Sequence, residues 1–222
     1  MPTEHHIEVR RTARYYTIGE PTNETRDVWF VCHGYGQLAR LFVREFEDIA
    51  SATRLLVAPE ALLRYYLSTE PGFHSTSSKV GATWMTREDR ESDIADYVDY
   101  LDTLYEEIFS RVRREDVSVT VLGFSQGGTT AYRWLTRGTA HADRLVMWGS
   151  TLPPEADLAE AARFFRGVKL TIIYGKRDQF ADDGMIAKYE TSLKEKDVPY
   201  EMVTFDGGHR LDRATLRGLT GA

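Results

Sequence analysis

The sequence predicts an α/β fold in which helices cover both faces of a mostly parallel sheet. Short apolar runs bounded by turn residues alternate with segments of helical spacing along most of the chain. This alternation favours parallel strands joined by right-handed crossovers. The length of 222 residues suits one domain, 1–222, with a sizeable core, and no internal repeat points to a solenoid.

The composition excludes several function classes. Acidic residues outnumber basic ones by 34 to 28, for a net charge of −6, so the basic excess of a nucleic-acid-binding protein is missing. The single Cys32 permits no internal disulfide. The N-terminus lacks the apolar stretch of a signal peptide, and no window approaches the roughly 18 apolar residues of a membrane span. We therefore expect a cytoplasmic protein without a nucleic-acid partner or a membrane span.

Six apolar runs predict buried strands. Such runs suit a sheet that is covered on both faces. An earlier β-rich segment, 7–18, predicts an antiparallel edge strand. The six runs are Val28–Cys32, Leu55–Ala58, Val117–Leu122, Leu145–Trp148, Leu170–Tyr174 and Tyr200–Phe205.

Apolar residues spaced by three and four predict the helices. The clearest stripe runs from Ile94 to Val112, and a second runs from Leu38 to Ile49. A shorter third stripe comprises Met185, Ile186, Tyr189 and Leu193. These segments lie between predicted strands, as crossover helices should.

The segment 59–90 has no sustained periodicity. It contains Pro71-Gly72 and a run of Ser and Thr at 75–78, and irregular segments of this length are usually functional or mobile. Because it follows a strand, it should lie over the carboxyl edge of the sheet, where open α/β folds bind ligands. We therefore expect a lid.

A Gly-x-Ser-x-Gly pattern marks the candidate nucleophile. A buried run leads into Gly123-Phe-Ser125-Gln-Gly127, and a plausible helix, 129–137, follows and ends at Gly138. A tight strand-to-helix turn of this kind presents the serine hydroxyl, and its glycines avoid collisions with the neighbouring backbone. Ser125 is therefore the candidate nucleophile, although a glycine-rich helix start would show the same letters.

A serine nucleophile needs a base and a residue that orients the base. Asp178 and His209 each follow a predicted strand, and the order Ser, Asp, His is that of hydrolases with this kind of turn. The candidates competing with Asp178 are Asp182, Asp183 and Asp206. Asp206 lies three residues from His209 in the same loop, so it can hardly approach the imidazole from behind.

Attack on a carbonyl develops an oxyanion, which needs hydrogen-bond donors. One donor should be the backbone N–H after the nucleophile, that of Gln126. The other should come from the loop 33–37, where glycines let backbone amides approach a substrate. We expect this second donor to be Tyr35, with Gly36 as the alternative.

Four motifs together resemble the α/β-hydrolase superfamily. They are His-Gly-Tyr-Gly at 33–36, Gly-Phe-Ser-Gln-Gly-Gly at 123–128, the Asp178 loop and Gly-Gly-His at 207–209. The short form without a cap domain is similar to the phospholipase/carboxylesterase family, which includes acyl-protein thioesterases. The resemblance implies a three-layer sandwich with a mostly parallel sheet and no separate cap domain. It also implies hydrolysis of esters or thioesters, with Tyr35 and Gln126 in the oxyanion hole.

Aromatic residues of the irregular segment are candidates for the substrate pocket. Tyr65, Phe73 and Trp84 could line an acyl or aryl site, or pack on the core. The family often carries Trp-Phe-Asp before its central helix, of which Trp84-Met85-Thr86 keeps only the tryptophan. The resemblance implies that Trp84 faces the site.

Other chemistries have less support. Gly34-x-Gly36-x-x-Ala39 with Glu60 after the next strand satisfies a dinucleotide-binding fingerprint, but it leaves the three triad candidates unexplained. A ligand-binding protein that keeps the fold without turnover is a further alternative. His5-His6 lacks metal-ligand spacing, Cys32 lies in a buried strand, and His33 should make a structural hydrogen bond. We expect no metal and no cofactor. The expected substrates are small-molecule acyl esters and thioesters, and the sequence does not decide between them. It is also compatible with either a monomer or a homodimer.

Overall fold

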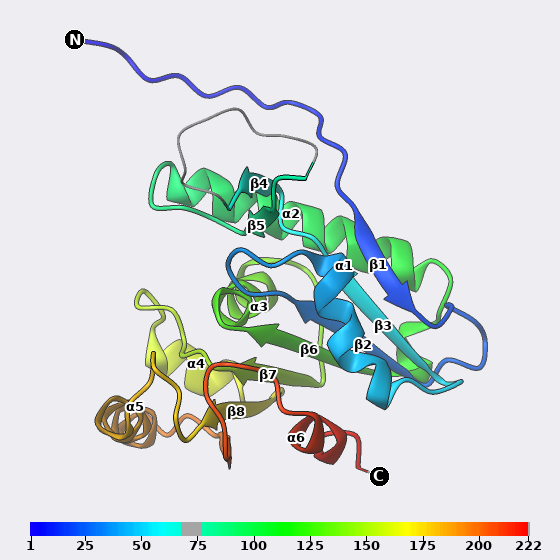
Figure 1. Ribbon diagram of the computed structural model, residues 1–222, viewed down its shortest axis with the longest axis vertical. Coiled ribbons are helices and arrows are strands. Elements are labelled where there is room, and N and C mark those ends of the chain that lie inside the picture. Colours follow the sequence, from blue (N-terminus) through cyan, green and yellow to red (C-terminus); the bar gives the residue numbers. More distant parts are fainter. Residues whose placement is uncertain (68–76, 222) are drawn as a thin grey trace.

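The computed structural model describes residues 1–67 and 77–221, and within them seven strands form one twisted sheet in the order β1-β3-β2-β6-β7-β8-β9 (Figure 1). All neighbouring pairs are parallel except β1 with β3. The strands are β1 (Tyr15–Ile18), β2 (Asp27–Cys32), β3 (Arg54–Pro59), β6 (Ser118–Phe124), β7 (Arg144–Trp148), β8 (Lys169–Gly175) and β9 (Glu201–Phe205). All six predicted runs form strands within one or two residues of the predicted bounds. Five of them are buried as predicted, whereas β9 is an edge strand in which only Phe205 is buried, so the prediction of burial was wrong there.

The N-terminal edge is shorter than predicted. Only Tyr15–Ile18 of the segment 7–18 forms a strand, paired with Leu56–Pro59 of β3. Ile7 and Val9 are 87% and 78% exposed. Since Pro59 is the last residue of β3, residues before Tyr15 have no strand left to pair with.

Helices cover both faces of the sheet. One face carries α2 (Arg90–Phe109), α3 (Gln126–Arg137), α4 (Leu158–Phe164) and α5 (Asp183–Glu195). The other carries α1 (Ala39–Phe42), the 3-10 helix η1 (Val43–Ile49) and α6 (Arg213–Gly218). A further 3-10 turn, η2 (Arg114–Asp116), precedes β6. The three apolar stripes therefore formed helices, whereas α4 and α6 are too short to show a stripe.

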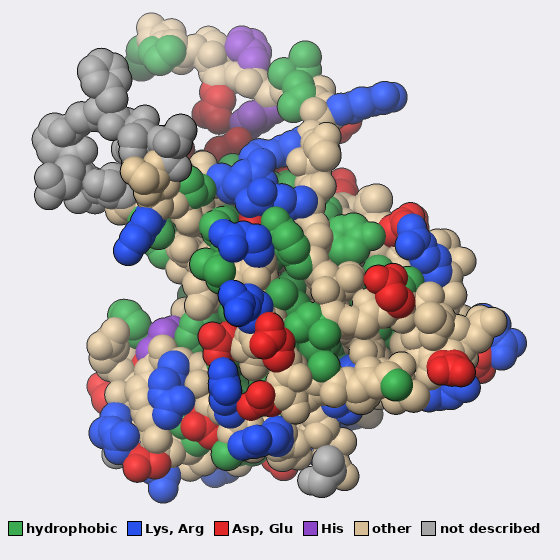
Figure 2. Space-filling view, turned by 45° about the vertical axis from the view of Figure 1, so that its right-hand side comes forward, with side chains coloured by type: hydrophobic (Ala, Val, Ile, Leu, Met, Phe, Trp, Pro, Cys, Tyr) green, Lys and Arg blue, Asp and Glu red, His purple; other side chains and the backbone are tan. Residues whose placement is uncertain are grey.

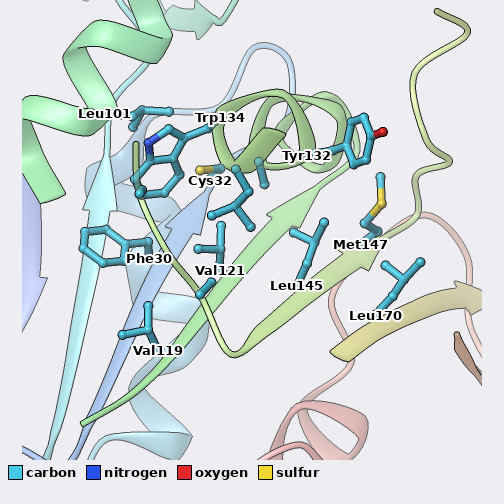
Figure 3. Packing of buried hydrophobic residues seen from close by; sticks show 14 of the residues in the cluster. Phe30, Cys32, Leu101, Val119, Val121, Tyr132, Trp134, Leu145, Met147 and Leu170 are labelled. Atoms are coloured by element: carbon cyan, nitrogen blue, oxygen red, sulfur yellow. The ribbon is translucent and has the colours of Figure 1, made fainter. Parts of the chain in front are cut away.

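Two apolar layers join these helices to the sheet. In the first, Phe30 of β2 contacts Trp134 of α3 edge-on, with ring centroids 5.3 Å apart (Figure 3). Leu101 of α2 packs in the same layer, and each such side chain contributes roughly 1.5–3 kcal/mol when fully buried. The second layer joins Trp29, Phe46 and Trp148 under α1, η1 and α6. Packing on both faces explains why β2, β3 and β6 are buried from their second residue onward.

The segment 59–90 is more ordered than its sequence suggests. Strands β4 (Leu63–Tyr66) and β5 (Val80–Thr83) pair antiparallel in register Leu63 with Thr83. The prediction of an irregular segment was therefore wrong at both ends, because four-residue strands are too short to show a period. Residues 68–76 lie outside the described residues, so the lid remains a prediction.

The surface carries charges of both signs. Lys and Arg side chains lie among Asp and Glu over the lower half of the face in Figure 2, while hydrophobic side chains gather in its middle. None of the helices within residues 1–67 and 77–221 has the length and apolar character of a membrane span. No separate cap domain is found in the same residues.

Candidate active site

Ser125 lies at the sharp turn between β6 and α3. Its backbone has φ 53° and ψ −120°, a conformation that costs about 1–3 kcal/mol for a residue other than glycine. The Ser125 N–H donates to Trp148 O of the neighbouring strand at 2.8 Å. A Cβ on Gly123 would lie 2.1 Å from Gly127 O, and one on Gly127 would lie 2.2 Å from Cys32 O. The glycines of the motif thus allow the turn to pack against its own helix and β2.

Asp178 and His209 form a hydrogen-bonded pair beside this turn. Asp178 follows β8 and His209 follows β9, and Nδ1 of His209 lies 2.7 Å from Oδ2 of Asp178. The side chain of His209 is 14% exposed and that of Asp178 is 1% exposed. Oδ1 of Asp178 accepts a hydrogen bond from the Phe180 N–H at 2.9 Å. This arrangement directs the Nδ1 proton to the carboxylate and leaves Nε2 of His209 as an acceptor.

The competing carboxylates have other partners. Asp182 caps α5 by accepting from the Met185 N–H at 2.8 Å, and Asp206 pairs with Arg177. The side chain of Asp183 lies outside the described part of the structure. Asp178 is thus the carboxylate that reaches the imidazole.

Ser125 and His209, both in the described part of the chain, both lie near Gly149 but are not hydrogen-bonded to each other. A Cβ on Gly149 would lie 2.9 Å from Cε1 of His209, and Gly149 lines the same cavity as Ser125. Catalytic hydrogen bonds are often long in unliganded structures and shorten only in the substrate complex. The imidazole is held between Phe124 and Phe180, each with its ring centroid 4.8 Å away.

Three backbone amides of the loop 33–37, those of Gly34, Gly36 and Gln37, already donate hydrogen bonds. The Gly34 N–H donates to Oε1 of Gln37 at 2.7 Å, and the Gln37 N–H donates to Gly34 O at 3.2 Å. The Gly36 N–H donates to Ala82 O at 2.8 Å. Gly36 therefore cannot offer its amide to an oxyanion without breaking that bond. Tyr35 N–H has no hydrogen-bond partner among the described residues.

The Gln126 amide is the other backbone N–H predicted to bind the oxyanion. Gln126 is the first residue of α3, and the first N–H groups of a helix lack intrahelical partners. Its side chain is held by strand β5 and the residues after it. Within residues 1–67 and 77–221, the amides of Tyr35 and Gln126 thus have no competing acceptor, and Gln126 directly follows the strained Ser125.

Comparison with protein families decides where the chain belongs. A family model described as Phospholipase/Carboxylesterase matches residues 13–220. The chain belongs to the phospholipase/carboxylesterase family. Its fold is accordingly the α/β-hydrolase fold, and the dinucleotide-binding alternative is set aside.

Solved structures with the same fold share little sequence identity with this chain. Acyl-protein thioesterase 2 from Zea mays superposes with a TM-score of 0.67 at 16% identity, over 95% of this chain and 99% of that one. A carboxylesterase from Mesorhizobium loti has a TM-score of 0.65 at 19% identity, over 95% of each chain. A carboxylesterase from Bacillus cereus has a TM-score of 0.60 at 15% identity, over 94% of this chain and 92% of the other. No curated protein sequence matches this chain significantly.

Trp84 supports the loop 33–37 from behind in this family member. Its side chain is 1% exposed, and its Nε1–H donates to His33 O at 2.8 Å. The expectation that Trp84 faces the site is therefore corrected, because its ring is buried in the core and tilted against that of His33, with ring centroids 5.1 Å apart. His33 makes the expected structural hydrogen bonds: Nδ1 donates to Gly34 O at 2.8 Å, and Nε2 accepts from the Ala61 N–H at 3.1 Å. Burial lowers the pKa of His33.

The remaining pocket candidates stand elsewhere. The ring of Tyr65 packs on that of Tyr35, with centroids 5.4 Å apart, and Tyr65 does not line the cavity at Ser125. Phe73 lies outside the described residues. Cys32 is fully buried, and burial raises the pKa of its thiol to about 12, which makes it unsuitable as a nucleophile.

A cavity of about 460 Å³ opens at Ser125, and its lining is mostly apolar. Tyr174 and the start of α5 form part of its wall. The stripe of Met185, Ile186 and Tyr189 predicted a helix, but its spacing carries no sign that the helix also lines a cavity. The cavity is lined by Ser125, Gln126, Thr129, Gly149, Ser150, Thr151, Tyr174, Phe180, Ala181, Met185, Ile186, Lys188 and Tyr189.

One exposed group of side chains has the chemistry to bind a cation. Ligand atoms of Glu4, His6 and Asp89 all lie within 4.8 Å of one another. The group includes none of the triad residues, and clusters of exposed acidic groups are common without a metal.

Proposed function

We propose that the protein is a serine hydrolase that cleaves carboxylic esters or thioesters through an acyl-serine intermediate. The observation that carries the proposal is the 2.7 Å contact between His209 and a nearly fully buried Asp178, next to the strained turn that holds Ser125. Burial orients the carboxylate, and the carboxylate fixes the tautomer of the imidazole. Membership of the phospholipase/carboxylesterase family supports this reaction class.

In the proposed acylation step, the Ser125 Oγ–carbon bond forms as the substrate carbonyl becomes tetrahedral. His209 Nε2 takes the hydroxyl proton, which requires its contact with Ser125 to close when substrate binds. The amides of Tyr35 and Gln126 stabilise the oxyanion, and each such donor contributes about 10² to 10³ in rate. The bond to the alcohol or thiol then breaks, and His209 returns the proton to this leaving group. Asp178 orients the imidazole throughout.

Deacylation repeats these steps with water in place of the alcohol. His209 removes a proton from water, the hydroxide adds to the acyl carbon, and the Ser125 ester bond breaks with return of the proton to Oγ. Every proton is accounted for by water, His209 and the leaving group. The reaction therefore needs no cofactor.

We propose that the acyl group of the substrate occupies the 460 Å³ cavity beside Ser125. Its walls of Phe180, Ile186 and Tyr189 suit an aliphatic or aromatic chain rather than a charged one. The substrates would be small acyl esters or thioesters. A reducing compartment such as the cytoplasm suits a protein whose one cysteine is a buried thiol.

Labelling with a fluorophosphonate probe tests the nucleophile. We expect one probe per wild-type chain and none on Ser125→Ala, with both proteins folded by circular dichroism. A p-nitrophenyl ester series from acetate to decanoate, together with matched thioesters, then measures kcat/KM against chain length. Turnover retained by folded Ser125→Ala contradicts the proposal.

A protein with this fold that binds acyl compounds without turnover is the second candidate. The observation that favours it is the missing hydrogen bond between Ser125 and His209. It predicts saturable binding of a fatty acid, no labelling by the fluorophosphonate and no ester hydrolysis. The labelling experiment therefore decides between the two.

A further inference from the structure

The side chain of Gln126 bridges α3 to the end of strand β5. Its Oε1 accepts from the Trp84 N–H at 3.2 Å, and its Nε2 donates to Met85 O at 3.0 Å. An N–H group on one side and a carbonyl on the other fix the orientation of the side-chain amide. Thr83 Oγ1 lies between them, 2.9 Å from Nε2 and 3.0 Å from Oε1. The side-chain amide of Gln126 thus bonds to both a backbone N–H and a backbone C=O of this segment.

The same short segment also holds the loop 33–37. The Gly36 N–H donates to Ala82 O at 2.8 Å, and the Ala82 N–H donates to Gln37 O at 3.1 Å. A Cβ on Gly81 would lie 2.5 Å from Gly36 O, so the two backbones touch at this point. Residues 81–85 therefore contact both parts of the chain that carry an unpartnered amide.

These contacts matter because oxyanion donors act only at short range. Each donor must lie about 2.7–3.1 Å from the oxyanion, so the separation of the two amides has to be held closely. One amide belongs to a turn fixed by the sheet, and the other to a loop. Among the described residues, strand β5 and the residues directly after it hydrogen-bond both to the loop 33–37 and to the side chain of Gln126.

We propose that Thr83 and the side chain of Gln126 are positioning residues, which set the separation of the Tyr35 and Gln126 amides through strand β5. The inference rests on the proposed function and adds residues to its machinery. Thr83 is 2% exposed and does not line the cavity at Ser125, so it acts through Gln126 and not on substrate. The side chain of Gln126 likewise acts apart from its own backbone amide.

The test compares Thr83→Val and Gln126→Met with two controls in the ester assay. Thr83→Ser keeps the hydroxyl. Thr171→Val makes the same change at a residue that is 0% exposed and whose hydroxyl has no hydrogen-bond partner in the described residues. We expect kcat to fall roughly 10- to 100-fold in the two test variants, with KM within about threefold, because the lost interaction is with the transition state. Both controls should stay within about twofold of wild type.

A second measurement separates positioning from a loss of stability. A trifluoromethyl ketone is attacked by the serine and places an oxyanion in the same hole. Its Ki should weaken by the same factor as kcat/KM in Thr83→Val and Gln126→Met. The double variant should lose about as much as either single one, because both changes break one connection.

The outcomes distinguish this inference from the function on which it rests. Wild-type turnover that disappears in Ser125→Ala establishes the hydrolase. Unchanged kcat and Ki in both folded test variants then overturn the positioning role alone, even if Tm falls. If Thr83→Val does not fold, Gln126→Met decides, since Gln126 is only half-buried at the start of α3. A wild type without turnover overturns both proposals.

Discussion

The candidate site has two walls that are built in different ways. The wall of Ser125, Asp178 and His209 consists of side chains placed at the ends of β6, β8 and β9, so the register of the sheet positions it. The wall of Tyr35 and Gln126 consists of backbone amides, and in our proposal hydrogen bonds from β5 and the two residues after it position these amides. The first depends on the core of the protein, whereas the second depends on a few polar contacts. Substitutions should therefore affect the two walls differently.

The largest effect should come from the imidazole. His209→Ala removes the group that accepts and returns the proton, and we expect kcat to fall by roughly 10⁴ to 10⁶. Because His209 lies in the loop after β9 and not within the sheet, the fold should persist. Steady-state kinetics and a thermal melt test this, and near-normal kcat in the folded variant would contradict the role of the triad wall.

A methyl group at Gly81 should disturb the amide wall. Its Cβ would lie 2.5 Å from Gly36 O and 2.8 Å from Gly36 Cα, both backbone atoms. We expect Gly81→Ala to lower kcat about 10- to 100-fold and stability by about 1–3 kcal/mol. Gly218→Ala is the control, because no atom lies within 4 Å of its Cβ position. Equal kcat in the two variants would show that the hairpin does not govern the amides.

A larger side chain at Ile186 should change selectivity without touching either wall. Ile186 lines the cavity from α5. We expect Ile186→Phe to lower kcat/KM for octanoyl esters about tenfold and for acetyl esters less than threefold, because only the longer chain reaches α5. Ile186→Leu, which conserves volume, should resemble the wild type. An equal loss for both esters would remove this cavity as the acyl site.

The smallest effect concerns the segment after β7. Its first residues, 149–151, line the cavity, and ion pairs of Glu155 hold its later part against α2 and α3. Glu155 accepts from Arg133 Nε at 2.6 Å and from Arg90 Nη2 at 2.9 Å. Burial raises the pKa of Glu155, but these hydrogen bonds outweigh burial and lower the pKa to about 2 from an ordinary 4.5. A depressed pKa stabilises the fold above about pH 4.5, and that stability is lost as the pH falls toward 2.

Glu155→Gln removes the charge that pairs with the two arginines and should therefore reduce the free energy of unfolding at pH 7. We expect a reduction of only about 1–2 kcal/mol, because solvent screens a partly exposed carboxylate. The variant should also lose less stability than the wild type on going from pH 5 to pH 2. Urea unfolding across this range measures both. Parallel pH curves for the two proteins would show that the ion pairs do not contribute.

The parts of the fold that sequence could predict are those with a repeated pattern. Continuous apolar runs predicted β2 and β3, and a stripe of steps of three and four predicted α2, because burial of a strand or a helix face leaves a regular pattern in the sequence. The hairpin of β4 and β5 has only four residues in each strand and shows no period. The 81–85 contacts with Gly36 and Gln126 join residues more than 40 positions apart, and no local pattern encodes them.

Sequence alone therefore determined which chemical groups are present and the order in which the chain supplies them. The glycines around Ser125 signal a close approach, and an acid and a histidine after later strands follow from the same fold. Tertiary structure decided that Trp84 supports a loop instead of binding substrate, that the Gly36 amide is already bonded, and that α5 forms the cavity wall. The physical reason is that the burial of a strand or helix leaves a periodic pattern in consecutive residues. The partner of a hydrogen bond and the residues that line a cavity depend instead on which distant segments of the chain come together.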